Sequence, residues 1–106
     1  MSYRFMRMIV MFDLPSESAE EKRNYRRFRK ALITNGFYMM QESVYTRMLI
    51  TPSAQLSALE AVRRNKPQGG VVQVMTVTEK QFSKMEYIVG EHRSETLDSD
   101  ERLVIL

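Results

Sequence analysis

Residues 4–15 read RFMRMIVMFDLP, and the alternation over residues 4–13 predicts a β-strand. Successive side chains of a strand point to opposite faces of a sheet, so apolar residues at every second position mark the face that contacts the core. That apolar face consists of Met6, Met8, Val10 and Phe12. The strand should end before Pro15, because proline has no amide hydrogen to donate to a β-ladder.

A helix is predicted to follow this strand. Ser18 and Glu21 have the spacing of a capping box, in which each side chain accepts a hydrogen bond from a backbone amide at the helix start. The Asn35-Gly36 pair supplies a C-terminal stop. One apolar stripe of this helix should face the core: Tyr25, Phe28 and Leu32.

Residues 37–87 predict further strands and a second helix. Residues 37–50 are rich in β-forming side chains with a polar interruption, which predicts two short strands or one kinked strand. Thr51-Pro52 is a good start for a helix. The buried stripe of that helix should be Leu56, Leu59 and Val62. Residues 71–78 are dominated by β-branched side chains, which favours an interior strand, whereas residues 79–87 fit either a short helix or a strand.

The resulting order, βαββαβ, matches an α+β, ferredoxin-like sandwich in which both helices cover one face of the sheet. We expect a single domain over residues 1–106, with a core in 1–78 and an extension in 79–106 that docks a dimer mate or another partner. The uncovered sheet face needs burial, which predicts a homodimer. Four apolar residues end the chain and should add a C-terminal strand at such an interface: Leu103, Val104, Ile105 and Leu106.

Composition favours a soluble cytoplasmic protein with an anionic partner. Lys and Arg number 16 against 13 Asp and Glu, and the sequence pI is about 9.4. The chain has no cysteine, which excludes disulfides and zinc–thiolate sites and fits a reducing compartment. No apolar run reaches the roughly 18 to 20 residues that a membrane-spanning helix needs.

Basic residues gather in the first predicted helix, where residues 22–30 read KRNYRRFRK. At 100° per residue, four of them cluster opposite the apolar stripe, and we interpret them as a phosphate-binding ridge: Arg23, Arg26, Arg27 and Lys30. A solvated helix surface is the alternative. The scarcity of acidic partners four residues away favours the nucleic-acid interpretation.

Asp13 is the candidate catalytic and metal-binding residue. A carboxylate at the end of an apolar strand usually hydrogen-bonds a local turn, and that alternative stays open. A hard divalent cation takes one or two carboxylates together with water and phosphate oxygens. In a symmetric dimer with Asp13 near the axis, two such carboxylates would converge without a second motif in the chain.

Several segments together resemble the Cas2 family, the second of the CRISPR-associated proteins, and its type II-A members in particular. They are FDLP at 12–15, GF at 36–37, QESVY at 41–45, TVTEKQF at 76–82 and the apolar tail, with the basic helix between the first two. The resemblance covers essentially the whole chain. It implies a ferredoxin-like homodimer that bridges two dimers of the Cas1 integrase and holds captured duplex DNA during spacer acquisition.

The resemblance also implies chemistry at Asp13. Some family members are described as magnesium-dependent endonucleases, and the family's metal-binding acid falls on Asp13, which would make one Mg²⁺ site shared across the dimer. Phe12 stands where many relatives have tyrosine, which removes a hydroxyl near that acid. The scaffold role in integration does not require this cleavage activity.

Two other functions remain open. A toxin-type endoribonuclease of similar fold would also be a small basic dimer with an acid at a strand end. An RNA-recognition module would need stacking aromatic residues on its central strands, and residues 71–78 contain none.

Overall fold

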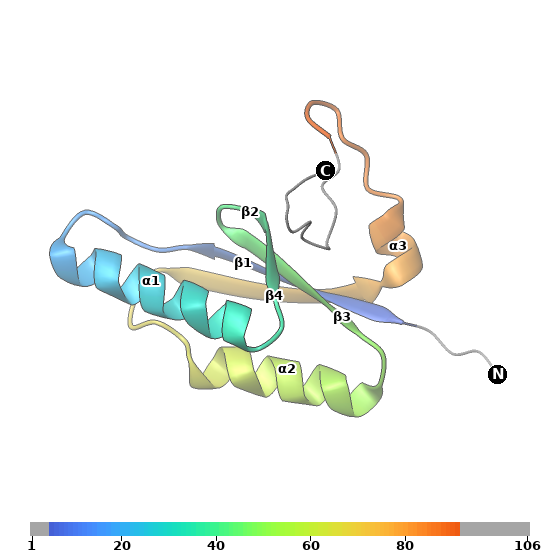
Figure 1. Ribbon diagram of the computed structural model, residues 1–106, viewed down its shortest axis with the longest axis horizontal. Helices are drawn as coiled ribbons and strands as arrows, with labels where there is room; N and C mark the ends of the chain where they lie inside the picture. The colour runs from blue at the N-terminus through green and yellow to red at the C-terminus, as the bar shows by residue number, and fades with distance from the viewer. Residues whose placement is uncertain (1–4, 92–106) are drawn as a thin grey trace.

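A four-stranded antiparallel sheet carries two long helices on one of its faces (Figure 1). The computed structural model describes residues 5–91. Its elements are β1 (Met6–Asp13), α1 (Ala19–Thr34), β2 (Tyr38–Gln41), β3 (Val44–Leu49), α2 (Pro52–Arg64), β4 (Val71–Thr78) and α3 (Glu79–Ser83). The predicted α+β, ferredoxin-like order is therefore confirmed, and the ambiguous segment after β4 begins with a short helix.

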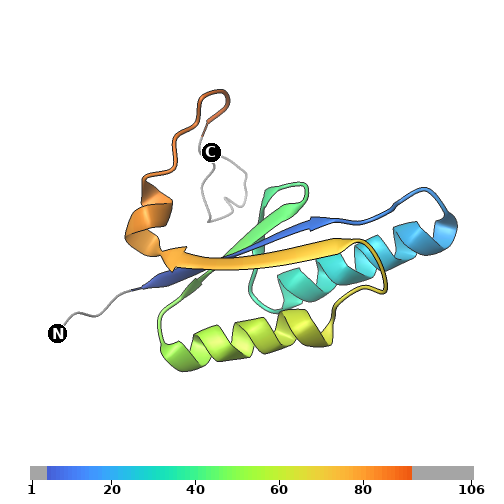
Figure 2. The same cartoon turned by 180° about the vertical axis from the view of Figure 1, so that it is seen from behind.

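β1 lies inside the sheet, where the strand order is β2-β3-β1-β4. Val10 of β1 pairs with Tyr45 of β3 on one side and with Val74 of β4 on the other. The prediction that residues 71–78 form an interior strand is wrong for the described part of the chain, because β4 pairs with β1 alone and forms an edge (Figure 2). Side chains that suit a half-buried pleated surface do not distinguish an edge strand from a central one.

The core lies between the apolar face of β1 and the two helices. Met8, Val10 and Phe12 are at most 6% exposed, which confirms the predicted core face of β1. Phe12 meets Phe28 of α1 edge-on, with ring centroids 5.1 Å apart, and stacks on Tyr45 at 5.7 Å. Such pairs add to the free energy gained by burying each ring.

The predicted buried face of α2 is confirmed at Val62, which is buried, and at Leu59, which packs partly buried against the core, but it is wrong at Leu56. Leu56 is 67% exposed, whereas Ala58, Ala61 and Val62 are buried. At 100° per residue, Leu56 lies about 160° from Ala58 around the helix, so the two residues cannot share a face. Alanine faces the sheet because its small side chain lets a helix approach closely, and a pattern built from the larger side chains misses it.

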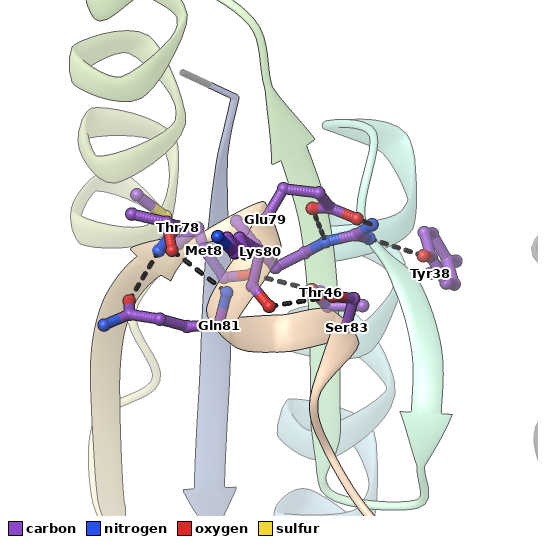
Figure 3. Close-up of polar contacts among 9 residues, drawn as sticks. Met8, Tyr38, Thr46, Thr78, Glu79, Lys80, Gln81 and Ser83 are labelled. Atoms are coloured by element: carbon purple, nitrogen blue, oxygen red, sulfur yellow. Dashed lines mark hydrogen bonds and ion pairs between the residues drawn. The ribbon is translucent and has the colours of Figure 1, made fainter.

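The opposite face of the sheet is left open by α1 and α2, and α3 covers only one end of it (Figures 1 and 2). Arg7 points to this face and is 1% exposed. Its Nε and Nη2 donate to the two carboxylate oxygens of Glu79, at 2.9 and 2.6 Å, and its Nη1 donates to the Tyr38 hydroxyl at 2.6 Å (Figure 3). The guanidinium also lies 4.3 Å from the centre of the Phe82 ring. These contacts attach α3 to β1.

The predicted C-terminal strand, Leu103, Val104, Ile105 and Leu106, lies outside the described residues. Within residues 5–91, no helix has both the length and the apolar character needed to cross a bilayer.

Candidate nucleic-acid interface

Asp13 ends β1 beside a hollow of about 420 Å³, which we name the Asp13 hollow. Its polar lining includes Asp13, Ser16, Lys22, Arg26, Glu42 and Ser43. These side chains come from the end of β1, from the first half of α1 and from the β2–β3 turn. The fold therefore places the candidate acid next to two bases that belong to a different element.

Close backbone packing holds Asp13 in place. Asp13 pairs with Val71, the first residue of β4. The preceding Gly70 has φ +81°, and a Cβ atom at Gly70 would lie 2.6 Å from the Asp13 carbonyl oxygen. On the other side, the Phe12 amide donates to the Ser43 carbonyl at 3.0 Å. Only glycine fits at position 70, since any side chain there would displace the end of β1.

A second hollow of about 500 Å³ lies against the β2–β3 hairpin, and we name it the hairpin hollow. It is lined by Tyr25, Arg29, Met39, Met40, Gln41 and Glu42. The Tyr25 hydroxyl donates to the Glu42 carbonyl at 3.2 Å. Tyr25 and Glu42 line both hollows, so this hydrogen bond joins α1 to the hairpin at the point where the two hollows meet.

The structure separates the four predicted ridge residues. Arg26 lines the Asp13 hollow, whereas Arg23, Arg27 and Lys30 are exposed on α1 and line neither hollow. Two bases outside the predicted ridge take their place. Lys22 lines the Asp13 hollow and Arg29 lines the hairpin hollow. The signal that could have found them is their spacing with Arg26, since positions 22, 26 and 29 fall on one side of a helix.

Positive charge on α1 is not neutralised by ion pairing in the described part of the chain. Arg7–Glu79 is the salt bridge found there, and it lies on the other face of the sheet. The six bases of α1 make no ion pair with a described residue: Lys22, Arg23, Arg26, Arg27, Arg29 and Lys30. Glu20 and Glu21 lie in the first turn, and Glu21 forms the predicted capping box with Ser18. Backbone amides of Ser18 and Glu17 donate to Glu21 and lower the pKa of its carboxyl.

Tyr45 of β3 lies close to Arg29, which lines the hairpin hollow. Its side chain is fully buried, and its hydroxyl has no hydrogen-bond partner among the described residues. Burial raises the pKa of the Tyr45 phenol, and the nearby Arg29 guanidinium offsets part of that rise. Tyr25 and Glu42 are also within electrostatic reach of this hydroxyl.

Metal ligands are sparse in one copy of the chain. No group of three or more His, Asp or Glu side chains that could hold an ion occurs among residues 5–91. The Asp13 hollow offers the carboxylates of Asp13 and Glu42 and the hydroxyls of Ser16 and Ser43. Hard oxygen donors of this kind fit Mg²⁺, which binds through one or two carboxylates and keeps several waters. Asp13 and its neighbours therefore fit the expected ion as a partial ligand set.

Comparisons with known proteins agree with one another. The family model described as CRISPR associated protein Cas2 matches residues 6–85. A protein of Treponema denticola named CRISPR-associated endoribonuclease Cas2 is 50% identical over 101 residues, which cover 95% of this chain and all of that protein. Proteins with the same name from Streptococcus mutans and Lacticaseibacillus rhamnosus are 46% and 41% identical, each over 95% of this chain and over 93% and 100% of their own lengths. The chain belongs to the Cas2 family of CRISPR-associated proteins.

Proposed function

We propose that this protein is the nucleic-acid-holding subunit of a CRISPR adaptation complex. A homodimer in the cytoplasm bridges two Cas1 dimers and holds captured duplex DNA while Cas1 carries out strand transfer. The observation that carries the proposal is the set of six α1 bases with no ion-pair partner among the described residues, three of which line two adjoining hollows. Such a surface binds the phosphate backbone with little regard to sequence, as storage of arbitrary spacers requires.

The open sheet face supports a homodimer. Its side chains on the two central strands are largely apolar, and Met48 of β3 is 39% exposed while Met75 of β4 is 47% exposed. Apolar surface of this kind on a small domain favours burial against a second copy. Residues 103–106 would extend the same interface by adding a strand. A two-fold axis near the ends of the two β1 strands would bring together Asp13 from each subunit.

Phosphodiester cleavage would use the same end of the molecule. Mg²⁺ bound by Asp13 of both subunits would stabilise negative charge on the phosphoryl oxygens. Lys22 and Arg26 line the same hollow and would bind and orient the phosphate beside the acid. Holding a duplex requires only the basic side chains, whereas cleavage also requires Asp13.

An endoribonuclease function is the second candidate, because the relatives quoted above carry that name. The position of Asp13 in the same hollow as Lys22 and Arg26 supports an endoribonuclease as well as it supports a subunit that holds DNA. An RNA-recognition module has less support. The open-face residues of β1 are Arg7, Ile9 and Met11, and the facing residues of β3 are also non-aromatic, so the two central strands offer no stacking platform.

Reconstitution with Cas1 from the same CRISPR locus tests the proposal. We expect the purified chain to sediment as a dimer at micromolar concentration, to co-purify with Cas1, and to be required for integration of a labelled duplex into a repeat-containing plasmid. A chain lacking residues 103–106 should dimerise or bind Cas1 more weakly. Integration by Cas1 at the same rate without this chain would refute the scaffold role, and a purely monomeric sedimentation profile would refute the dimer.

A further inference from the structure

The two hollows adjoin along the seam between α1 and the β2–β3 hairpin, and we name them together the groove. They share Tyr25 and Glu42, whose hydrogen bond lies between them. Asp13 lies in the first hollow, while Met39 and Met40 line the second. The groove therefore reaches from the end of β1 to the hairpin beside residues 22–29 of α1.

Three bases from α1 line this groove: Lys22, Arg26 and Arg29. At 100° and 1.5 Å per residue, they lie within about 60° of one another and are separated by about 6 Å and 4.5 Å along the helix axis. One strand of a duplex carries a phosphate about every 3.4 Å of axial rise. A span of about 10.5 Å equals about three such steps, so the three bases can each contact a different phosphate of one strand.

We propose that this groove is the path of one sugar-phosphate strand of the bound duplex, with Lys22, Arg26 and Arg29 contacting successive phosphates. The inference rests on the proposed function and specifies where the strand lies. It assigns the contacts to the flank of α1 that faces the hairpin, and it leaves Arg23, Arg27 and Lys30 on the outer flank without phosphates. Because Asp13 lies in the same groove, the path brings the phosphate chain to the candidate acid.

A pair of charge-matched triple variants tests the path. Lys22→Gln/Arg26→Gln/Arg29→Gln and Arg23→Gln/Arg27→Gln/Lys30→Gln each remove three positive charges from exposed positions of one helix. Affinity for a duplex is measured over a salt series, and circular dichroism confirms folding. Each lost phosphate contact lowers the slope of log affinity against log salt by about 0.9, so the groove triple should flatten the slope by about 2.7 for each groove the duplex occupies. The outer triple should change it by less than about 1.

The outcomes separate this inference from the proposed function. Equal slope changes in the two triples, or a larger change in the outer triple, would overturn the groove while leaving duplex binding intact. No duplex binding by the unmodified protein at low salt would instead overturn the proposed function. The same series on single-stranded RNA identifies the occupant, since a groove-triple effect seen with RNA alone would overturn the assignment to duplex.

Removing a negative charge from the groove gives a second test, since it should strengthen duplex binding. Glu42 is exposed and lines both hollows, so its carboxylate opposes a phosphate chain in the groove. Glu42→Gln should tighten duplex binding about three-fold or more at low salt, because it removes a like charge from the path. The matched control, Glu60→Gln on α2, lies outside both hollows and should leave affinity unchanged. An unchanged affinity for Glu42→Gln would overturn the proposed path.

Discussion

The Arg7–Glu79 pair gives a prediction about stability. Removing Glu79 should destabilise the fold more than removing Arg7, because Arg7 is the more deeply buried partner. Arg7 is 1% exposed and Glu79 is 29% exposed at their side chains. Glu79→Gln keeps the shape of the side chain but removes the negative charge that pairs with the buried guanidinium. Arg7 then retains the hydrogen bond to Tyr38 at 2.6 Å and the contact with the Phe82 ring at 4.3 Å.

The magnitude follows from these contacts. Breaking a buried ion pair by removing one partner costs about 3 to 5 kcal/mol, and the partial exposure of Glu79 together with the contacts that Arg7 keeps lowers the expectation to about 2 to 3 kcal/mol. Arg7→Met should cost only about 1 kcal/mol, because Glu79 can turn to solvent and methionine fills the buried site. The double variant should resemble Arg7→Met, since no uncompensated charge remains buried.

Urea unfolding followed by circular dichroism, at one fixed protein concentration, measures the three free energies. Glu79→Gln should also lower the melting temperature by about 8 to 12 °C for a domain of this size. Glu60→Gln is the matched control, because Glu60 is exposed and makes no ion pair with a described residue, and it should stay within about 0.5 kcal/mol of the unmodified protein. The reasoning fails if Glu79→Gln is no more destabilising than this control, or if the double variant is less stable than Glu79→Gln.

Three further predictions concern single side chains. Asp13→Ala should abolish divalent-dependent phosphodiester cleavage and leave Cas1-dependent integration largely intact, and loss of integration by a folded, assembled complex would contradict the scaffold role. The pKa of Glu21 is lowered from 4.5 by amide hydrogen bonds, so its stabilisation is present above that pH and is lost as the pH falls through the lowered pKa. Urea unfolding of Glu21→Gln should therefore differ from the unmodified protein at about pH 6 and converge with it in acid, whereas a constant difference would contradict this. Burial raises the pKa of Tyr45 from 10.0, so the free energy of unfolding falls as the pH rises above that value. Tyr45→Phe should reduce this alkaline loss and stabilise the fold by up to about 1 kcal/mol at neutral pH. Urea unfolding curves at neutral and at alkaline pH check both effects.

Much of the local structure could be predicted because its signals lie close together along the chain. The capping box of Ser18 and Glu21, the apolar face of β1 and the helix start at Thr51 each depend on residues within a few positions of one another. The prediction from periodicity failed where the size of the side chains, and not their spacing, determined which face of a helix is buried. On α2, alanines face the sheet and Leu56 faces solvent.

The candidate site could also be predicted from the sequence only in part. Asp13 could be singled out from its place at the end of an apolar strand, and the bases of α1 from their density. Which of those bases stand beside Asp13 depends on where the β2–β3 turn lies against the helix, and this placed Lys22, Arg26 and Arg29 in the groove. The predictions of metal binding and phosphate contact stay predictions.

The sequence by itself determined the order of strands and helices, the core face of β1 and the position of the acid, because each is a property of neighbouring residues. Only the tertiary structure decided that β4 lies at an edge, that Arg7 is neutralised by a carboxylate 72 residues away, and that the groove joins α1 to the hairpin. Those features arise from contacts between segments far apart in the chain. Their residues carry no common period or motif, so only the packing of the whole sheet against its helices brings them together.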